Sequence, residues 1–160
     1  MKTKVGIIGS TGYTGVVLAR ILINHPEVEL SYLSSEQYSE KHFYEAYPHF
    51  FDSLREKCKA VNAKSIGKSC ELVFFATPNE FSRSFLPELL KINPNLKVID
   101  LSADFRLESY FGLNKKEKIT ITYGLPEIHK ERIKSSQIVA NPGCYPTSAL
   151  LGLLPVLKKD

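Results

Sequence analysis

The chain has 160 residues, of which 43% are hydrophobic and 24% are charged, as expected for one globular domain with its own core. Its formal net charge of +4 comes from scattered Lys and Arg residues, which argues against a nucleic-acid partner. The sequence has no apolar run long enough to span a bilayer, and its first residues lack a signal-peptide pattern. The 3 cysteines have no metal-ligand spacing, so we expect a cytoplasmic protein with reduced thiols, no metal and no membrane contact.

A glycine-rich loop follows the first predicted strand. Residues 5–8 form an apolar run typical of a buried strand, and residues 16–23 predict a helix packed on the core. Glycines between a strand and a helix allow a tight turn and close approach to a pyrophosphate, which the helix N-terminus stabilises. A purely structural glycine turn is the alternative. The residues of this predicted dinucleotide site are Gly9, Ser10, Thr11, Gly12, Tyr13, Thr14 and Gly15.

The second predicted strand, residues 28–33, ends in two hydroxyl side chains, Ser34 and Ser35. Enzymes that use NAD commonly place a carboxylate here for the ribose hydroxyls. The two serines leave room for a 2′-phosphate, so we predict that both contact the cofactor and that it is NADP, although Glu36 follows directly. The aromatic-rich segment 37–62 is predicted mainly to cover the sheet.

Two later apolar runs, residues 72–76 and 97–101, predict strands that end at the same edge of the sheet. The second run leads to Arg106, whose guanidinium can bind phosphate through two parallel hydrogen bonds. A surface ion pair of Arg106 with Asp104 or Glu108 is the alternative. The residues predicted to contact the cofactor are Ala76, Thr77 and Pro78, and those predicted to bind the substrate are Arg106, Ser102 and Asn141.

Predicted strands over 119–123 and 137–140, with a helix over 128–134 between them, continue the alternation of strand and helix. Such alternation along the chain predicts an α/β fold. We expect a doubly wound, mostly parallel, Rossmann-type sheet with helices on both faces.

The stretch 141–147, Asn-Pro-Gly-Cys-Tyr-Pro-Thr, places Cys144 directly after a Pro-Gly turn. The apolar run 148–154 predicts a buried helix that begins at this turn. Free N–H groups and the positive end of the helix dipole favour a thiolate there, so Cys144 is the predicted catalytic nucleophile. A buried structural thiol is the alternative. Cys58 and Cys70 have no such context and are predicted to be structural.

A nucleotide site and a reactive cysteine at one sheet edge favour one class of reaction. The thiolate attacks an activated acyl group to give a thioester, and hydride from a reduced nicotinamide converts the thioester to an aldehyde. Amides at the start of the Cys144 helix are candidate donors to the oxyanion. No sequence pattern identifies the general acid or base, and His129 is the one histidine kept as a candidate for this role.

Four stretches together resemble the N-acetyl-gamma-glutamyl-phosphate reductases of arginine biosynthesis. The resemblance implies that Cys144 is the nucleophile and NADPH the reductant. It also implies an acyl phosphate substrate, N-acetyl-L-glutamyl 5-phosphate, which is reduced to the 5-semialdehyde with release of phosphate. The full-length family member is expected to be a homo-oligomer. The matching stretches are residues 9–15 with Arg20 and His25-Pro26, then 98–107, 123–127 and 142–147.

Two features depart from this family. Residues 78–80 read Pro-Asn-Glu where the family commonly has Pro-His-Gly. Family members also continue into an α+β domain that carries the catalytic histidine and much of the dimer interface. The resemblance therefore implies that residues 1–143 form an NAD(P)-binding domain. It implies that residues 144–160 begin a truncated catalytic and dimerisation domain, and we expect the isolated chain to turn over poorly.

The sequence motifs have three alternative interpretations. Aspartate-semialdehyde dehydrogenases share the domain plan, but residues 143–147 argue against them. An N-acetyl-aminoadipyl-phosphate reductase of lysine biosynthesis would share nearly every motif. A nucleotide-binding module without catalysis is the third.

Overall fold

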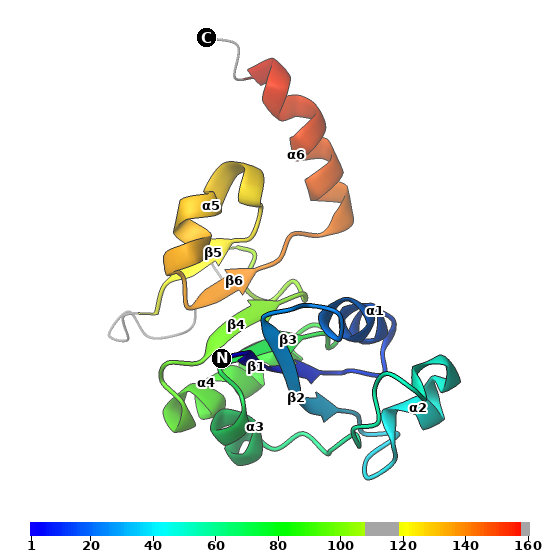
Figure 1. The fold of residues 1–160 in the computed structure, drawn as a ribbon. Helices are drawn as coiled ribbons and strands as arrows, with labels where there is room; N and C mark the ends of the chain where they lie inside the picture. The colour runs from blue at the N-terminus through cyan, green and yellow to red at the C-terminus, as the bar shows by residue number, and fades with distance from the viewer. Residues whose placement is uncertain (108–118, 158–160) are drawn as a thin grey trace.

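The computed structural model describes residues 1–107 and 119–157, and these contain one six-stranded sheet in which every pairing is parallel (Figure 1). The strands follow the order β2-β1-β3-β4-β6-β5 across the sheet. Their bounds are Thr3–Ile8 for β1, Val28–Ser34 for β2, Leu72–Phe75 for β3, Lys97–Asp100 for β4, Ile121–Tyr123 for β5 and Ile138–Ala140 for β6. The predicted doubly wound Rossmann-type sheet is confirmed.

The helices of the described residues lie between these strands along the chain, except α6, which follows β6. They are α1 (Tyr13–Leu22), α2 (Phe43–Ala46), the 3₁₀-helix η1 (Pro48–Phe50), α3 (Ala63–Ser69), α4 (Phe81–Ile92), α5 (Pro126–Ser135) and α6 (Cys144–Leu157). Helix α3 was not predicted from the sequence. The signal was present in Asn62, whose side chain accepts a hydrogen bond from Ser65 N at 2.9 Å and so caps α3.

Helices cover both faces of the sheet, and each face has its own apolar core. On one face, Val73 and Phe75 of β3 pack with α3 and α4. On the other, Val5 and Ile7 of β1 pack with α1 and the 43–54 segment. Within that segment Phe43 and Phe50 are at most 1% exposed, so the prediction that its aromatic residues cover the sheet is confirmed for these two.

The register aligns the ends of all six strands at one edge. The last residues lie in one row across the sheet, in the order Ser34, Ile8, Phe75, Asp100, Ala140 and Tyr123. The loops that follow these residues therefore meet at the carboxyl edge. Strands are added on opposite sides of β1, by β2 and then by β3, so the topological switch point lies between β1 and β3.

Helix α6 differs from its prediction. It was expected to be buried, but none of its described residues is buried, and Leu153, Val156 and Leu157 are each more than half exposed. Figure 1 shows α6 extending away from the sheet. An apolar run predicts burial only when another element packs against it, and no other described element does so here.

Candidate functional site

The glycine loop after β1 is shaped by close backbone contacts. Gly9 has φ +84°, and a Cβ there would lie 2.5 Å from the carbonyl oxygen of Ala76. A Cβ on Gly15 would lie 2.2 Å from the carbonyl oxygen of Gly9, so α1 packs directly on the loop. The Gly12 amide donates to the same Gly9 oxygen at 3.2 Å. These contacts require glycine at positions 9 and 15 and place the start of α1 next to β3.

Hydroxyl groups from the end of β2 hold this loop. The Gly9 amide donates to Ser34 Oγ at 3.0 Å, and Ser10 Oγ donates to the Ser34 carbonyl at 2.9 Å. Ser10 and Ser34 are fully buried. The hydroxyls of Thr11 and Ser35 are 2.6 Å apart. The structure thus uses Ser10 and Ser34 to support the loop, and Thr11, Ser34 and Ser35 line a cavity.

That cavity has a volume of about 380 Å³ and lies at the topological switch point. Eight of the residues predicted to contact the cofactor line it: Gly9, Thr11, Gly12, Ser34, Ser35, Ala76, Thr77 and Pro78. Tyr13 is 94% exposed, and Tyr13, Thr14, Ser10 and Gly15 are not among its lining residues. Five further lining residues were not predicted to contact the cofactor: Ile8, Glu36, Gln37, Val61 and Phe81. Glu36 and Gln37 could have been predicted because they directly follow Ser35, and Phe81 because it begins α4. Val61 lies in irregular backbone, and no sequence pattern marks it as a lining residue.

Two features of the cavity fit a dinucleotide. Gly9 and Gly12 line the cavity within the loop that leads into the N-terminus of α1, where a pyrophosphate is stabilised. The Thr77 hydroxyl is buried and has no hydrogen-bond partner among the described residues. Buried hydroxyls are normally hydrogen-bonded, so this oxygen is a candidate ligand contact.

Asp104 connects the loop after β4 to the N-terminus of α4. Its carboxylate accepts hydrogen bonds from the Glu80 amide at 2.7 Å, the Ser82 hydroxyl at 2.7 Å and the Arg83 amide at 3.1 Å. Burial opposes ionisation of Asp104, but these three donors outweigh it and lower the pKa of the carboxyl. Asp104 thereby anchors the segment that runs from Thr77 to the start of α4.

Glu80, immediately before α4, has φ +73°, the left-handed region that favours glycine. Glu80 is one of the residues at which the sequence departs from the Pro-His-Gly pattern, and its backbone has a conformation that glycine adopts without strain. The bond from the Glu80 amide to Asp104 contributes to holding this conformation.

Asp100 and Ser102 belong to the same buried network. Ser102 Oγ donates to Asp100 at 2.7 Å and lies 3.1 Å from Ser82 Oγ, which in turn donates to Asp104. Asp100 is fully buried, and this burial raises the pKa of its carboxyl. Ser102, predicted to bind substrate, is 5% exposed, and the structure places its hydroxyl within this network.

Arg106 joins the β4 loop to the loop of Cys144. Its Nε donates to the Asn141 carbonyl at 2.9 Å, and its Nη2 donates to the Leu101 carbonyl at 2.8 Å. A Cβ on Gly143 would lie 3.0 Å from Nη1. The alternative ion pair with Asp104 is wrong, because that carboxylate faces α4, and Glu108 lies outside the described residues. The structure therefore brings Arg106, Asn141 and the nucleophile loop together at one edge.

Cys144 is the first residue of α6 and is exposed. The Thr147 hydroxyl and amide both donate to the Gly143 carbonyl, at 2.8 and 3.1 Å, and so fix the first turn. The other two thiols are buried, as predicted for structural cysteines, and burial raises the pKa of both Cys58 and Cys70. An exposed sulfur at a helix N-terminus has the geometry of a nucleophile.

Neither a metal centre nor a membrane span is found among the described residues. They hold no group of three or more His, Cys, Asp or Glu side chains able to bind a metal ion. None of their helices is long and apolar enough to cross a bilayer. His129 lines a cavity together with Arg106.

A family model described as "Semialdehyde dehydrogenase, NAD binding domain" matches residues 4–136 of the chain. The chain belongs to this family. The matched range covers the glycine loop, the cavity at the switch point and Arg106. The part of the chain that contains the cavity is therefore the NAD(P)-binding domain of this family.

Curated relatives of this semialdehyde dehydrogenase domain agree with the resemblance seen in the sequence. The chain is 42% identical over 164 residues to the N-acetyl-gamma-glutamyl-phosphate reductase of Gloeothece citriformis, covering 97% of this chain and 46% of that protein. It is 41% identical to the enzyme of the same name from Pelotomaculum thermopropionicum, covering 99% of this chain and 48% of that protein. The chain thus spans about half the length of the curated relatives it matches.

Solved structures of semialdehyde dehydrogenases share the fold. Aspartate semialdehyde dehydrogenase with NADP from Candida albicans matches with a TM-score of 0.74 at 18% identity, over 99% of this chain and 48% of that one. Aspartate semialdehyde dehydrogenase II from Vibrio cholerae matches with a TM-score of 0.73 at 21% identity, over 99% and 47%. At these identities the likeness concerns the fold alone.

Proposed function

We propose that this chain is the cofactor-binding and nucleophile-bearing part of a cytoplasmic, NADPH-dependent N-acetyl-gamma-glutamyl-phosphate reductase. The observation that carries the proposal is the pair of hydrogen bonds that Arg106 donates to the Leu101 and Asn141 carbonyls. This arrangement ties the Cys144 loop to the sheet edge that also carries the dinucleotide cavity. Identity of about 40% to enzymes of that name supports the choice of substrate, N-acetyl-L-glutamyl 5-phosphate.

In the proposed reaction, the Cys144 thiolate attacks the acyl carbon and phosphate leaves, which gives a thioester on Cys144. The N–H groups left free in the first turn of α6 would stabilise the negative charge that develops on the acyl oxygen. Arg106 and Asn141 hold the loop in place, and Arg106 Nη1 is available to the phosphate. A bound reduced nicotinamide would supply the hydride that releases the aldehyde.

We propose that residues 1–143 form the NAD(P)-binding domain and that residues 144–160 begin a second domain. Helix α6 supports this boundary, because it is apolar over its length and none of its described residues is buried. The curated relatives are about twice as long as this chain. The second domain would cover α6, supply the missing proton-transfer group and contribute to a homo-oligomer.

Alkylation of the thiols tests whether Cys144 is the accessible nucleophile. At neutral pH, we expect iodoacetamide to modify Cys144 at least about tenfold faster than Cys58 or Cys70, because both of these are buried with raised pKa values. Mass spectrometry of tryptic peptides over time gives the three rates. The Cys144→Ser variant serves as the control and should lose the fast phase only. Equal rates for Cys144 and Cys58 would contradict the proposal.

Replacement of Ser35 tests the choice of NADP. Ser35 lines the dinucleotide cavity and its hydroxyl lies 2.6 Å from that of Thr11. We expect Ser35→Asp to weaken NADPH binding by about tenfold relative to NADH, because the new carboxylate repels the 2′-phosphate. Fluorescence titration with both nucleotides measures the ratio, and Ser35→Asn separates charge from size. An unchanged ratio would show that the phosphate does not lie beside Ser35.

A further inference from the structure

We propose that Tyr47, between α2 and η1, is a positioning residue that holds the glycine loop in the shape that a pyrophosphate requires. Its hydroxyl donates to the Thr11 carbonyl at 2.8 Å, although the two residues are 36 positions apart in the chain. Tyr47 does not line the dinucleotide cavity, so it acts on a ligand through the loop and not by contact. The role assigned to Tyr47 rests on the proposed dinucleotide binding.

The bond from Tyr47 fixes one peptide group at the start of α1. The Thr11 carbonyl and the Gly12 N–H belong to the same planar unit. The carbonyl accepts from Tyr47, and the N–H donates to the Gly9 carbonyl at 3.2 Å. Both polar atoms of this peptide are therefore bonded, and its plane cannot rotate without breaking one of the two bonds.

This peptide leads directly into the N-terminus of α1, because Gly12 is the N-cap residue of that helix. Gly12 has no side chain, and α1 has no side-chain cap at its first turn. Uncapped N–H groups and the positive end of the helix dipole are suited to a pyrophosphate. The direction of these N–H groups depends on the peptide that precedes them, and so on Tyr47.

The core holds the ring of Tyr47 in place. The ring centroid lies 5.7 Å from that of Phe43, which packs edge-on against Phe50 at 5.1 Å. Both phenylalanines belong to the apolar core on the α1 face of the sheet. The start of α2 is fixed as well, since the His42 amide donates to the Glu45 carboxylate at 2.7 Å. A side chain held in this way loses little further conformational entropy when its hydroxyl bonds to the loop.

The test is an NMR titration of the 160-residue chain and its Tyr47→Phe variant with NADPH. The variant lacks only the hydroxyl and keeps the ring in the core. We expect its affinity for NADPH to fall about fivefold, a typical effect of one lost hydrogen bond. The amide signals of Gly12 and Tyr13 should shift in the free variant.

Adenosine 2′-phosphate separates positioning from a general structural role, because this ligand has no pyrophosphate. Its affinity should change less than about twofold in Tyr47→Phe, since it does not depend on the first turn of α1. A variant that had lost its fold would bind both ligands less well.

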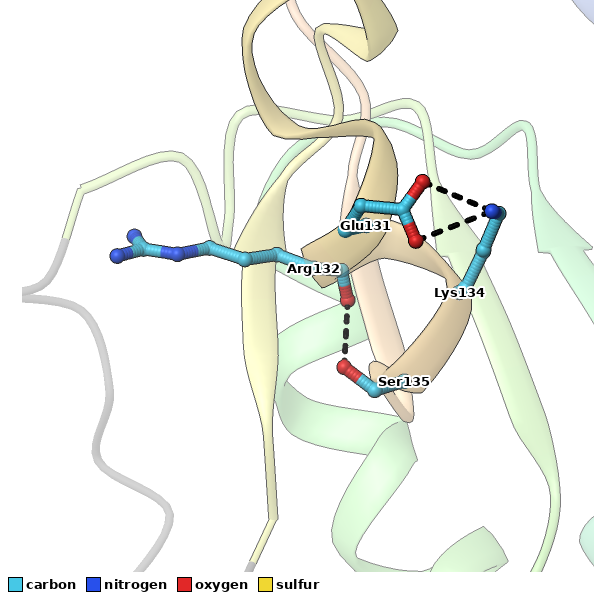
Figure 2. Close-up of polar contacts among 4 residues, drawn as sticks. All are labelled: Glu131, Arg132, Lys134 and Ser135. Carbon is cyan, nitrogen blue, oxygen red and sulfur yellow. Dashed lines mark hydrogen bonds and ion pairs between the residues drawn. The ribbon is translucent and has the colours of Figure 1, made fainter.

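Two further variants are matched controls. Tyr44→Phe removes a phenol hydroxyl from the same segment, one that has no hydrogen-bond partner among the described residues. Ser135→Ala removes a hydroxyl-to-carbonyl bond of the same kind elsewhere: Figure 2 shows Ser135 bonded to the Arg132 carbonyl, at 3.1 Å. Ser135 ends α5, which packs beside β5 at the opposite edge of the sheet from β2 (Figure 1). Both controls should keep the NADPH affinity within about twofold of wild type.

Two results would overturn the role of Tyr47 alone. One is an equal NADPH affinity in Tyr47→Phe and Tyr44→Phe. The other is an equal loss for NADPH and adenosine 2′-phosphate in Tyr47→Phe, which would indicate a general loss of structure. A wild-type chain that bound neither ligand would instead overturn the proposed dinucleotide binding, and the role of Tyr47 together with it.

Discussion

Gly15→Ala is expected to distort the glycine loop, abolish dinucleotide binding and lower the free energy of unfolding by about 3 kcal/mol, the upper range for overpacking. The added Cβ would lie 2.2 Å from the Gly9 carbonyl oxygen and 2.7 Å from two backbone atoms of Ser10. These neighbours are backbone atoms and cannot rotate away. The loop would have to move from α1, and the cavity at the switch point would lose its shape. Thermal unfolding and NADPH titration measure the two effects.

Gly152→Ala is the matched control for this experiment. Gly152 lies in α6 with no heavy atom within 4 Å of the position of a Cβ. There the alanine should raise helix stability by about 0.5–1 kcal/mol, because glycine is the poorer helix former. Dinucleotide affinity should not change. If Gly15→Ala bound NADPH as tightly as wild type, the close packing of α1 on the loop would not be needed for the site.

Asp104→Asn is expected to lower the free energy of unfolding by about 3 kcal/mol at neutral pH, because it removes the charge from an acceptor of three hydrogen bonds. The amide group it introduces would also face donors from α4. The segment from Thr77 to α4 would lose the hydrogen bonds that hold it to residue 104, so dinucleotide affinity should fall as well. Denaturant unfolding and fluorescence titration measure the two losses.

The pH dependence of Asp104→Asn follows from the lowered pKa of this carboxyl. A lowered folded-state pKa stabilises the protein above the unfolded value of about 4, and this contribution is lost as the pH falls through the folded value. The gap between wild type and variant should therefore shrink below pH about 4. A gap that does not depend on pH would show that the charge of Asp104 does not contribute.

Asp100→Asn is the control, and its stability relative to wild type should have the opposite pH dependence. Burial raises the pKa of Asp100, so ionising this carboxyl costs stability as the pH rises above about 4, toward and through its folded-state value. The variant lacks this cost, and its stability relative to wild type should improve over that range. Two carboxyls in one network, four residues apart, should thus give opposite trends. Parallel trends would contradict the assigned directions.

Much of the site could be predicted from sequence because its chemistry depends on local patterns. Strand, glycine loop and helix follow one another around Gly9, and the Pro-Gly turn leads directly into the helix of Cys144. The alternation of strands and helices also sufficed for the fold class. The resemblance to the reductases rests on the same short stretches, and the curated relatives agree with it.

Other parts could not be predicted because they depend on partners far along the chain. The prediction that Ser34 contacts the cofactor did not include its structural role, because its hydroxyl accepts a hydrogen bond from the Gly9 amide, 25 residues away. Asp104 caps a helix that begins more than 20 residues earlier. The burial of α6 was predicted from its apolar residues, but burial needs a packing partner, which the described chain does not contain.

The sequence by itself determined the six strands and their order along the chain, the glycine loop after β1 and the position of the proposed nucleophile at the start of α6. Backbone preferences and hydrophobic periodicity act over a few residues, so the sequence displays them directly. Only the tertiary structure decided that Arg106 holds the Cys144 loop and that Asp104 holds the loop of Thr77. It also brought His129 and Arg132 to the cavity of Arg106, because the parallel register aligns distant strand ends at one edge of the sheet.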